Sequence, residues 1–217
     1  HYDFNAQLSI DSRHTLLLPI NRGQGIIETA GLDKIIYMDS DKMNVILIGS
    51  GISINSIRFL PINAIKISIN STYKRFETDI NCTVENHISR NEHWHQSRPC
   101  IVKYSPDVKY PDNCYALKGK RYPYNMEGED GFACALSGLF ALHVVSVFGY
   151  QEKIPLSIYL MGYDHGGKRW NDPPQAKPSA YYSYKGKDGP DALYKPFLDF
   201  GHKIYTVNGT GRLPFPD

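Results

Sequence analysis

One short stretch constrains the fold of this chain more than any other. Residues 44–48 form an almost wholly apolar run of strand length, and Gly49-Ser50-Gly51-Ile52-Ser53 follows it directly. An apolar run that ends in glycine is typical of a strand buried on both faces, as in a parallel sheet. We expect a modest helix after the glycines, up to about residue 59. Such a strand–turn–helix unit indicates an α/β fold.

Further elements follow in a compatible order. Apolar, β-rich runs predict strands at residues 64–69, 80–84, 158–161 and 202–207, with earlier short strands at 15–19 and 34–38 around a glycine-rich turn at 22–25. Small and helix-forming residues predict helices at 132–148 and 192–200. Residues 88–130 read as irregular and 165–190 as a long loop. The order predicts a Rossmann-like, mostly parallel sheet with helices on both faces and a lid loop.

The length of 217 residues fits a single domain, 1–217. Within it we expect a ligand-binding core at 44–165, a lid at 166–190, a closing helix and strand at 191–217, and an N-terminal elaboration at 1–43. The chain is 41% hydrophobic and 21% charged, which is a globular composition. Its net charge of +2 argues against a dedicated duplex-DNA binder, so nucleic acid is expected only as an acceptor.

Cysteine usage predicts a cytoplasmic protein. None of the four cysteines has C-x-x-C spacing, so we interpret them as reduced thiols. Three glycosylation sequons, at Asn70, Asn81 and Asn208, are weak signals for secretion, and the chain does not start with a signal peptide. The longest apolar stretch, 132–147, is too short and too polar to span a membrane.

The glycine turn is the first candidate site. Glycines let the backbone approach a ligand closely, and a helix start would aim N–H groups at an anion. Gly49, Ser50, Gly51 and Ser53 are therefore candidate nucleotide contacts. The turn lacks the third glycine of a dinucleotide fingerprint and the Gly-Lys-Ser/Thr ending of a P-loop, which disfavours NAD binding and ATP hydrolysis. A tight turn without a ligand is the alternative.

Two asparagines follow predicted strands. Amides of Asn70 and Asn86 would point into the crevice above the sheet, where they suit a base or a ribose. Each asparagine alone is more often a capping residue than a ligand contact.

Gly162, Tyr163, Asp164 and His165 follow the strand at 158–161. A carboxylate and an imidazole there occupy the place where α/β enzymes hold catalytic groups, and His165 suits a general base near neutral pH. The alternative is that Asp164 caps a following turn and His165 is solvated.

Metal sites are disfavoured. His93 and His95 with Cys100 and Cys114 match no standard zinc spacing, and the Asp39-Ser40-Asp41 run precedes the glycine turn rather than following several strands. We therefore predict no metal and no cofactor.

The chain has sixteen tyrosines, several of them late in the sequence: Tyr181, Tyr182, Tyr184, Tyr194 and Tyr205. Tyrosine stacks on rings and hydrogen-bonds through its hydroxyl, so such clusters often line sites for sugars, bases or phosphates. Ordinary amphipathic packing is an equal alternative.

The order of these motifs resembles the bacterial sialyltransferase family that modifies lipooligosaccharide, and related Rossmann-like glycosyltransferases of bacteria and phages. The similarity covers about residues 44–165, through the glycine turn, Asn70, Asn86, Ser137-Gly138 and Gly162-Tyr163-Asp164. It implies that the glycine turn, both asparagines and Ser137-Gly138 contact a nucleotide. It also implies a catalytic histidine (His165 or His202) and a phosphate-binding tyrosine pair (Tyr181 and Tyr182).

The leading hypothesis is a metal-independent glycosyltransferase that uses a nucleotide-activated sugar and a histidine general base. One alternative is another nucleotide-processing enzyme on the same scaffold. Another is a non-enzymatic phage or assembly protein that retains the fold.

Overall fold

A computed structural model describes residues 25–29, 34–85, 98–120, 131–133, 136–165, 167–176, 193–208 and 213–216. The strand expected at 15–19, Asn86, Tyr181, Tyr182 and most of the expected lid lie outside these residues. Within the described part, no helix combines the length and apolar character that crossing a membrane requires.

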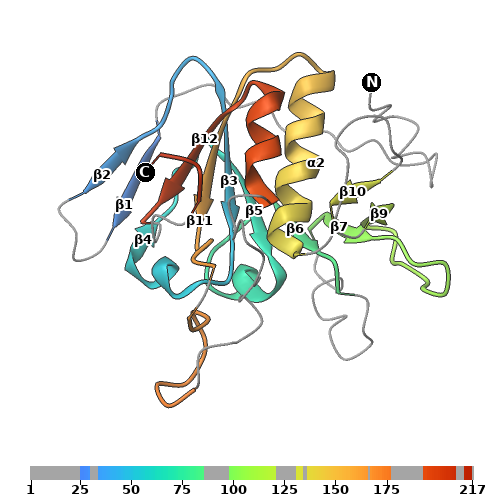
Figure 1. Cartoon of the computed structure of the whole chain (residues 1–217). Helices are drawn as coiled ribbons and strands as arrows, with labels where there is room; N and C mark the ends of the chain where they lie inside the picture. Colours follow the sequence, from blue (N-terminus) through green and yellow to red (C-terminus); the bar gives the residue numbers. More distant parts are fainter. Residues whose placement is uncertain are drawn as a thin grey trace.

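A seven-stranded parallel sheet forms the centre of the molecule (Figure 1). Its strands lie in the order β12-β11-β3-β5-β6-β7-β8, and each neighbouring pair is parallel. Their bounds are β3 Met43–Ile48, β5 Ile65–Ile69, β6 Ile80–Thr83, β7 Cys100–Lys103, β8 Cys114–Leu117, β11 Leu156–Met161 and β12 Lys203–Val207. The predicted α/β class with a mostly parallel sheet is confirmed.

β3 and β11 are neighbouring interior strands and pair along their whole length, from Leu156 opposite Met43 to Met161 opposite Ile48. Every residue of both strands is buried. Since each face of these strands must be covered, both read in the sequence as continuous apolar runs rather than alternating ones.

One face of the sheet is covered by the helix α2 (Ser137–Gln151) and the 3-10 helix η5 (Lys195–Phe200), which lie side by side in Figure 1. Side chains of β3 and β11 on this face pack with Phe140 and Phe197. α2 is buried almost all round, because the sheet lies on one side and η5 on another. This explains why its sequence shows little amphipathic pattern.

The other face carries a small antiparallel sheet of order β2-β1-β4, formed by β1 (Ile26–Thr29), β2 (Ile35–Tyr37) and β4 (Ile57–Phe59). Ile27 of β1 and Ile54 pack there against Ile46 and Met161. The expected helical cover of both faces stays a prediction, since the described residues place α2 on one face and strands on the other.

Several predicted elements need correction. The helix expected up to residue 59 is wrong: a 3-10 turn, η1 (Ile52–Ser56), leads directly into β4, which pairs with β1. The helix expected from residue 132 begins at Ser137, because residues 132–133 form β10 (Phe132–Ala133) beside β9 (Gly119–Lys120). The region read as irregular contains β7 and β8.

Candidate ligand site at the carboxyl edge of the sheet

The carboxyl edge of the sheet contains a topological switch point between β3 and β11. From β3 the chain continues through β5, β6, β7 and β8 on one side, whereas β11 and β12 lie on the other side. In open parallel sheets, ligands bind in the crevice at such a reversal. The two loops that leave the sheet here are Gly49-Ser50-Gly51 and Gly162-Tyr163-Asp164, both of them singled out from the sequence.

The two loops are hydrogen-bonded to each other. The N–H of Gly49 donates to Met161 O (2.7 Å), and the N–H of Gly51 donates to Gly162 O (2.8 Å). A Cβ atom on either Gly49 or Gly51 would lie 2.6 Å from Gly162 O. Gly162 itself has a left-handed backbone, with φ of +68°. The glycines are therefore required for the close approach of one loop to the other.

Asp164 holds the segment that follows the glycine turn. Its side chain is buried, with 4% exposure, and it accepts a hydrogen bond from Ser53 N (2.9 Å) and a second, short one from Ser53 Oγ. This is the geometry of a cap on η1, supplied from a position 111 residues away. The structure thus gives Asp164 a positioning role, but on a turn 111 residues earlier rather than on a turn that follows it, and it brings Ser53 to the same place.

This arrangement changes how the glycine turn can act. The expected helix start is absent from the described residues, because η1 is a single 3-10 turn. The N–H groups of Gly49, Gly51 and Ser53 all donate within the protein. These N–H groups are therefore not directed at a bound anion, and the turn instead holds the β3 and β11 loops together.

Asn70 lies at the same edge, directly after β5. Its backbone is left-handed, with φ of 55°, and its Oδ1 accepts a hydrogen bond from Thr83 Oγ1 (2.8 Å) at the end of β6. Thr72, in the 3-10 helix η2 (Asn70–Lys74), donates to Ile48 O at the end of β3 (2.8 Å). These bonds connect the carboxyl ends of β3, β5 and β6.

The first turn of α2 is hydrogen-bonded to the segments that leave β6 and β11 at this edge. Ser137 Oγ accepts a hydrogen bond from Val84 N (3.2 Å), just beyond β6, and Gly138 O accepts one from Tyr163 Oη (3.0 Å). A Cβ on Gly138 would lie 2.9 Å from the Tyr163 ring. The N-cap residue is Leu136, whose side chain has no oxygen to cap the first turn. The predicted contacts Ser137 and Gly138 are thus brought close to the β3–β11 loops.

The described beginning of the expected lid lies against the glycine turn. Trp170 N donates to Ser50 O (3.0 Å), and Gly51 forms an antiparallel bridge with Arg169. Asn55 Nδ2 donates to Trp170 O (3.3 Å). The beginning of the expected lid is therefore packed against the glycine turn and η1; the remainder of the expected lid lies outside the described residues.

The two candidate histidines lie at opposite edges. His165 follows Asp164 at the carboxyl edge, has a left-handed backbone (φ 47°), and packs edge-on against Tyr194, with ring centroids 4.9 Å apart. His202 precedes β12 and therefore lies at the amino edge. Its Nε2 lies 2.8 Å from Ser146 O, and burial lowers its pKa. The structure does not bring His202 together with the other candidates.

Sequence reasoning gave Tyr163 no role of its own at this edge and missed Thr83 altogether. Tyr163 is buried between its loop and α2, and burial raises the pKa of its phenol. The Gly162-Tyr163-Asp164 run contained this signal, but from the sequence a side-chain role was assigned only to the carboxylate and to the histidine that follows it. Among the residues that the structure describes, no group of three or more histidine, cysteine or acidic side chains is placed to hold a metal ion.

No family model matches the chain, and no match is found among curated proteins or solved structures.

Proposed function

We propose that the switch-point crevice between β3 and β11 binds a nucleotide or nucleotide sugar, and that the chain transfers the sugar to a hydroxyl-bearing acceptor without a metal ion. The nucleoside would lie against Asn70 and the glycine turn. The phosphates would lie at the first turn of α2, beside Ser137 and Gly138.

The observation that carries the proposal is the start of α2. Its 15 residues begin at the switch-point edge, and the N–H of Phe140 donates to the carbonyl of Leu136, the N-cap residue. The N–H groups that precede Phe140 have no carbonyl within the helix to receive them. Together with the helix dipole they favour an anion, which a phosphate would supply.

Group transfer needs charge stabilisation and a base. When the nucleotide leaves the anomeric carbon, negative charge develops on its phosphate oxygens, and hydroxyls of Tyr181 and Tyr182 would stabilise that charge by hydrogen bonds. His165 would take the proton of the acceptor hydroxyl. We prefer His165 to His202 because only His165 lies at the carboxyl edge. Asp164 would hold the glycine turn rather than transfer a proton.

A binding protein without catalysis is the second candidate. It is favoured by the engagement of Asp164 and of the Gly49 and Gly51 N–H groups inside the protein, which resembles a scaffold more than a reacting centre. Another nucleotide-processing enzyme is the third, and release of the nucleotide without an acceptor would identify it.

A thermal-shift screen with CMP, UDP, GDP, ADP and their common sugar conjugates tests the site. A ligand at 100 times its dissociation constant stabilises the fold by about 2.7 kcal/mol, which is a shift of about 5–10 °C for a domain of this size. Asn70→Gly keeps the left-handed backbone and removes the amide, so we expect about five- to tenfold weaker binding. Asn208→Gly is the matched control, because Asn208 has the same backbone conformation (φ 54°) at the end of the outer strand β12.

A selective shift that Asn70→Gly reduces and Asn208→Gly preserves supports the crevice and names the nucleotide. The shifting sugar conjugate is then incubated with mixed acceptors to detect transfer. Absence of any shift in a well-folded sample contradicts nucleotide binding, and a shift without turnover or hydrolysis selects the binding protein.

A further inference from the structure

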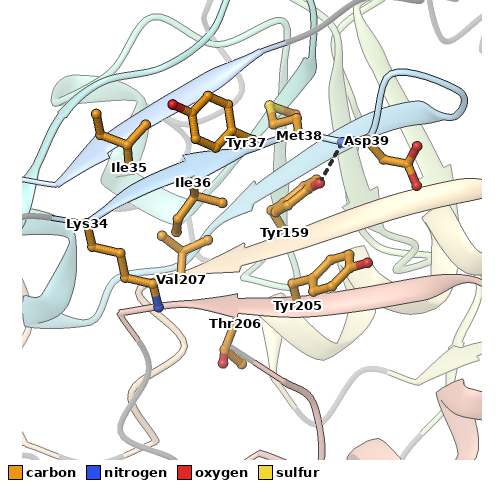
Figure 2. A pocket seen from close by; sticks show the side chains of 10 residues that line it. All are labelled: Lys34, Ile35, Ile36, Tyr37, Met38, Asp39, Tyr159, Tyr205, Thr206 and Val207. Carbon is orange, nitrogen blue, oxygen red and sulfur yellow. Dashed lines mark hydrogen bonds between the residues drawn. The ribbon is translucent and has the colours of Figure 1, made fainter.

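A separate hollow of about 430 Å³ lies on the other face of the sheet (Figure 2). Strand β2 and its flanks form one wall, and the edge strand β12 with Tyr159 of β11 forms the floor. The hollow is therefore distant in the fold from α2, which covers the opposite face. Its existence does not depend on the proposed nucleotide site.

The floor of the hollow is a tyrosine pair. The rings of Tyr159 and Tyr205 are stacked, with centroids 5.2 Å apart and planes 19° from parallel. The Tyr159 hydroxyl accepts a hydrogen bond from Asp39 N (3.1 Å), which fixes the inner ring. Tyr205 lies outside it and is half-buried. Tyr37, 73% exposed, stands on the opposite wall.

The two ends of the hollow are charged. Asp39 lies at one end, where its Oδ2 is 3.4 Å from Lys203 Nζ and 4.0 Å from Lys42 Nζ. The hydrogen bond from Asp41 N and the two ammonium groups lower the pKa of Asp39, so it is a carboxylate at neutral pH. Lys34 lies at the other end. Five residue steps separate Lys34 from Asp39, which is about 16 Å of extended chain.

We propose that this hollow binds a short, uncharged oligosaccharide, with one pyranose ring stacked on Tyr205 and its hydroxyls bonded at the Asp39–Lys203 end. The face of an aromatic ring carries negative quadrupole charge, which attracts the C–H face of a sugar ring. The carboxylate accepts from sugar hydroxyls and the ammonium donates to them. A few convergent polar groups around an aromatic surface are what orient a small ligand in such a site.

The two ends of the hollow differ in charge from its floor. Lys34 and Asp39 are the charged residues among those that line it, and Asp39 also faces the ammonium groups of Lys203 and Lys42. The tyrosine pair between the two ends is uncharged and offers a ring face, which suits the C–H face of a pyranose.

Isothermal titration calorimetry with maltohexaose, cellohexaose, xylohexaose and chitohexaose tests the proposal on the full chain. We expect one of these probes to bind, Tyr205→Ala to weaken it about tenfold, and Tyr205→Phe to stay within about threefold, because the ring carries the stacking. Asp39→Asn should weaken binding about fivefold or more through the lost charged hydrogen bond. Tyr104→Ala, at an exposed tyrosine (36%) outside the hollow, is the matched control and should leave binding unchanged.

Failure of all four sugars to bind the folded wild-type chain overturns the proposal. Binding that Tyr205→Ala leaves unaltered overturns it as well, and loss of that binding in Asn70→Gly would place the sugar at the carboxyl edge. Circular dichroism of Tyr205→Phe and Tyr205→Ala shows whether each is folded. Nucleotide-induced thermal shifts should be the same in the Tyr205 variants and the wild type, so this site and the nucleotide site can fail independently.

Discussion

Replacement of Asp164 tests whether its carboxylate positions the segment after the glycine turn or takes part in catalysis. Asp164 accepts two hydrogen bonds from Ser53 and is buried, so Asp164→Ala leaves the Ser53 N–H without its acceptor. Hydrogen bonds to a charged group contribute about 1.5–3 kcal/mol each, so we expect the two together to account for about 3–6 kcal/mol. At about 2–4 °C per kcal/mol, the melting temperature should fall by about 6–24 °C. Asp164→Asn keeps one acceptor oxygen and should cost about half as much.

Thermal and urea denaturation of Asp164→Ala, Ser53→Ala and the double variant measure this directly. Because the two residues share their bonds, the double variant should lose less than the sum of the single losses, with a coupling of at least about 1 kcal/mol. Additive losses, or a melting temperature that stays within about a degree of wild type in Asp164→Ala, would refute the positioning role and return Asp164 to the list of catalytic candidates.

Three further predictions concern Leu136, His202 and the tyrosines Tyr181 and Tyr182. Leu136→Asp adds a side-chain cap at the start of α2, where the phosphate is proposed. Nucleotide-induced thermal shifts should therefore disappear, while the melting temperature without ligand changes by at most a few degrees. Persistence of the shifts would contradict the phosphate position. Burial lowers the pKa of His202 below its usual 6.5, so the unfolded state binds more protons there and stability should be lost as pH falls below about 6.5. His202→Asn should lose less stability than wild type between pH 7.5 and 5 in urea denaturation, and an equal loss would contradict this cause. Tyr181→Phe and Tyr182→Phe should lower turnover of a sugar donor more than its binding, and unchanged turnover in both would exclude them from phosphate stabilisation.

The parts of the fold that the sequence predicts are those whose burial leaves a local pattern. β3 and β11 are covered on both faces, so their apolar runs are unmistakable. β7 and β8 have four residues each, and β8 is an edge strand of the sheet, with half-buried Tyr115 and Ala116. Such short strands stand out little from the surrounding prolines and charges. The place of β7 depends on its partner β6 and that of β8 on β7, and a local pattern does not report either partner.

The misread segment after the glycine turn has a tertiary cause. Ile54 and Ile57 are three residues apart, which suits a helix, but both side chains are buried against the small antiparallel sheet. β4 exists because it pairs with β1, whose Glu28 and Thr29 lie opposite Phe59 and Ile57. Local propensity gave no sign of that partner, and tertiary pairing overrides it.

The candidate site shows the same division between local and distant information. Strand ends placed the glycine turn, Asn70 and Gly162 at one edge, because parallel strands bring their carboxyl ends together, whereas Ser137-Gly138 was suggested by the family resemblance alone. The roles within that edge depend on contacts such as Ser53 with Asp164, which no spacing reveals.

Two groups at this edge were candidates to bind an anion, and they are now distinguishable. The glycine turn gives its Gly49 and Gly51 N–H groups to Met161 and Gly162, so its glycines serve loop packing. The first turn of α2 begins at an apolar N-cap and is hydrogen-bonded to Val84, just beyond β6, and to Tyr163, just beyond β11. A phosphate that binds this chain is therefore expected at the first turn of α2, and not at the glycine turn that the sequence motif suggests. Nucleotide binding should accordingly respond to Leu136→Asp more strongly than to changes at Ser50.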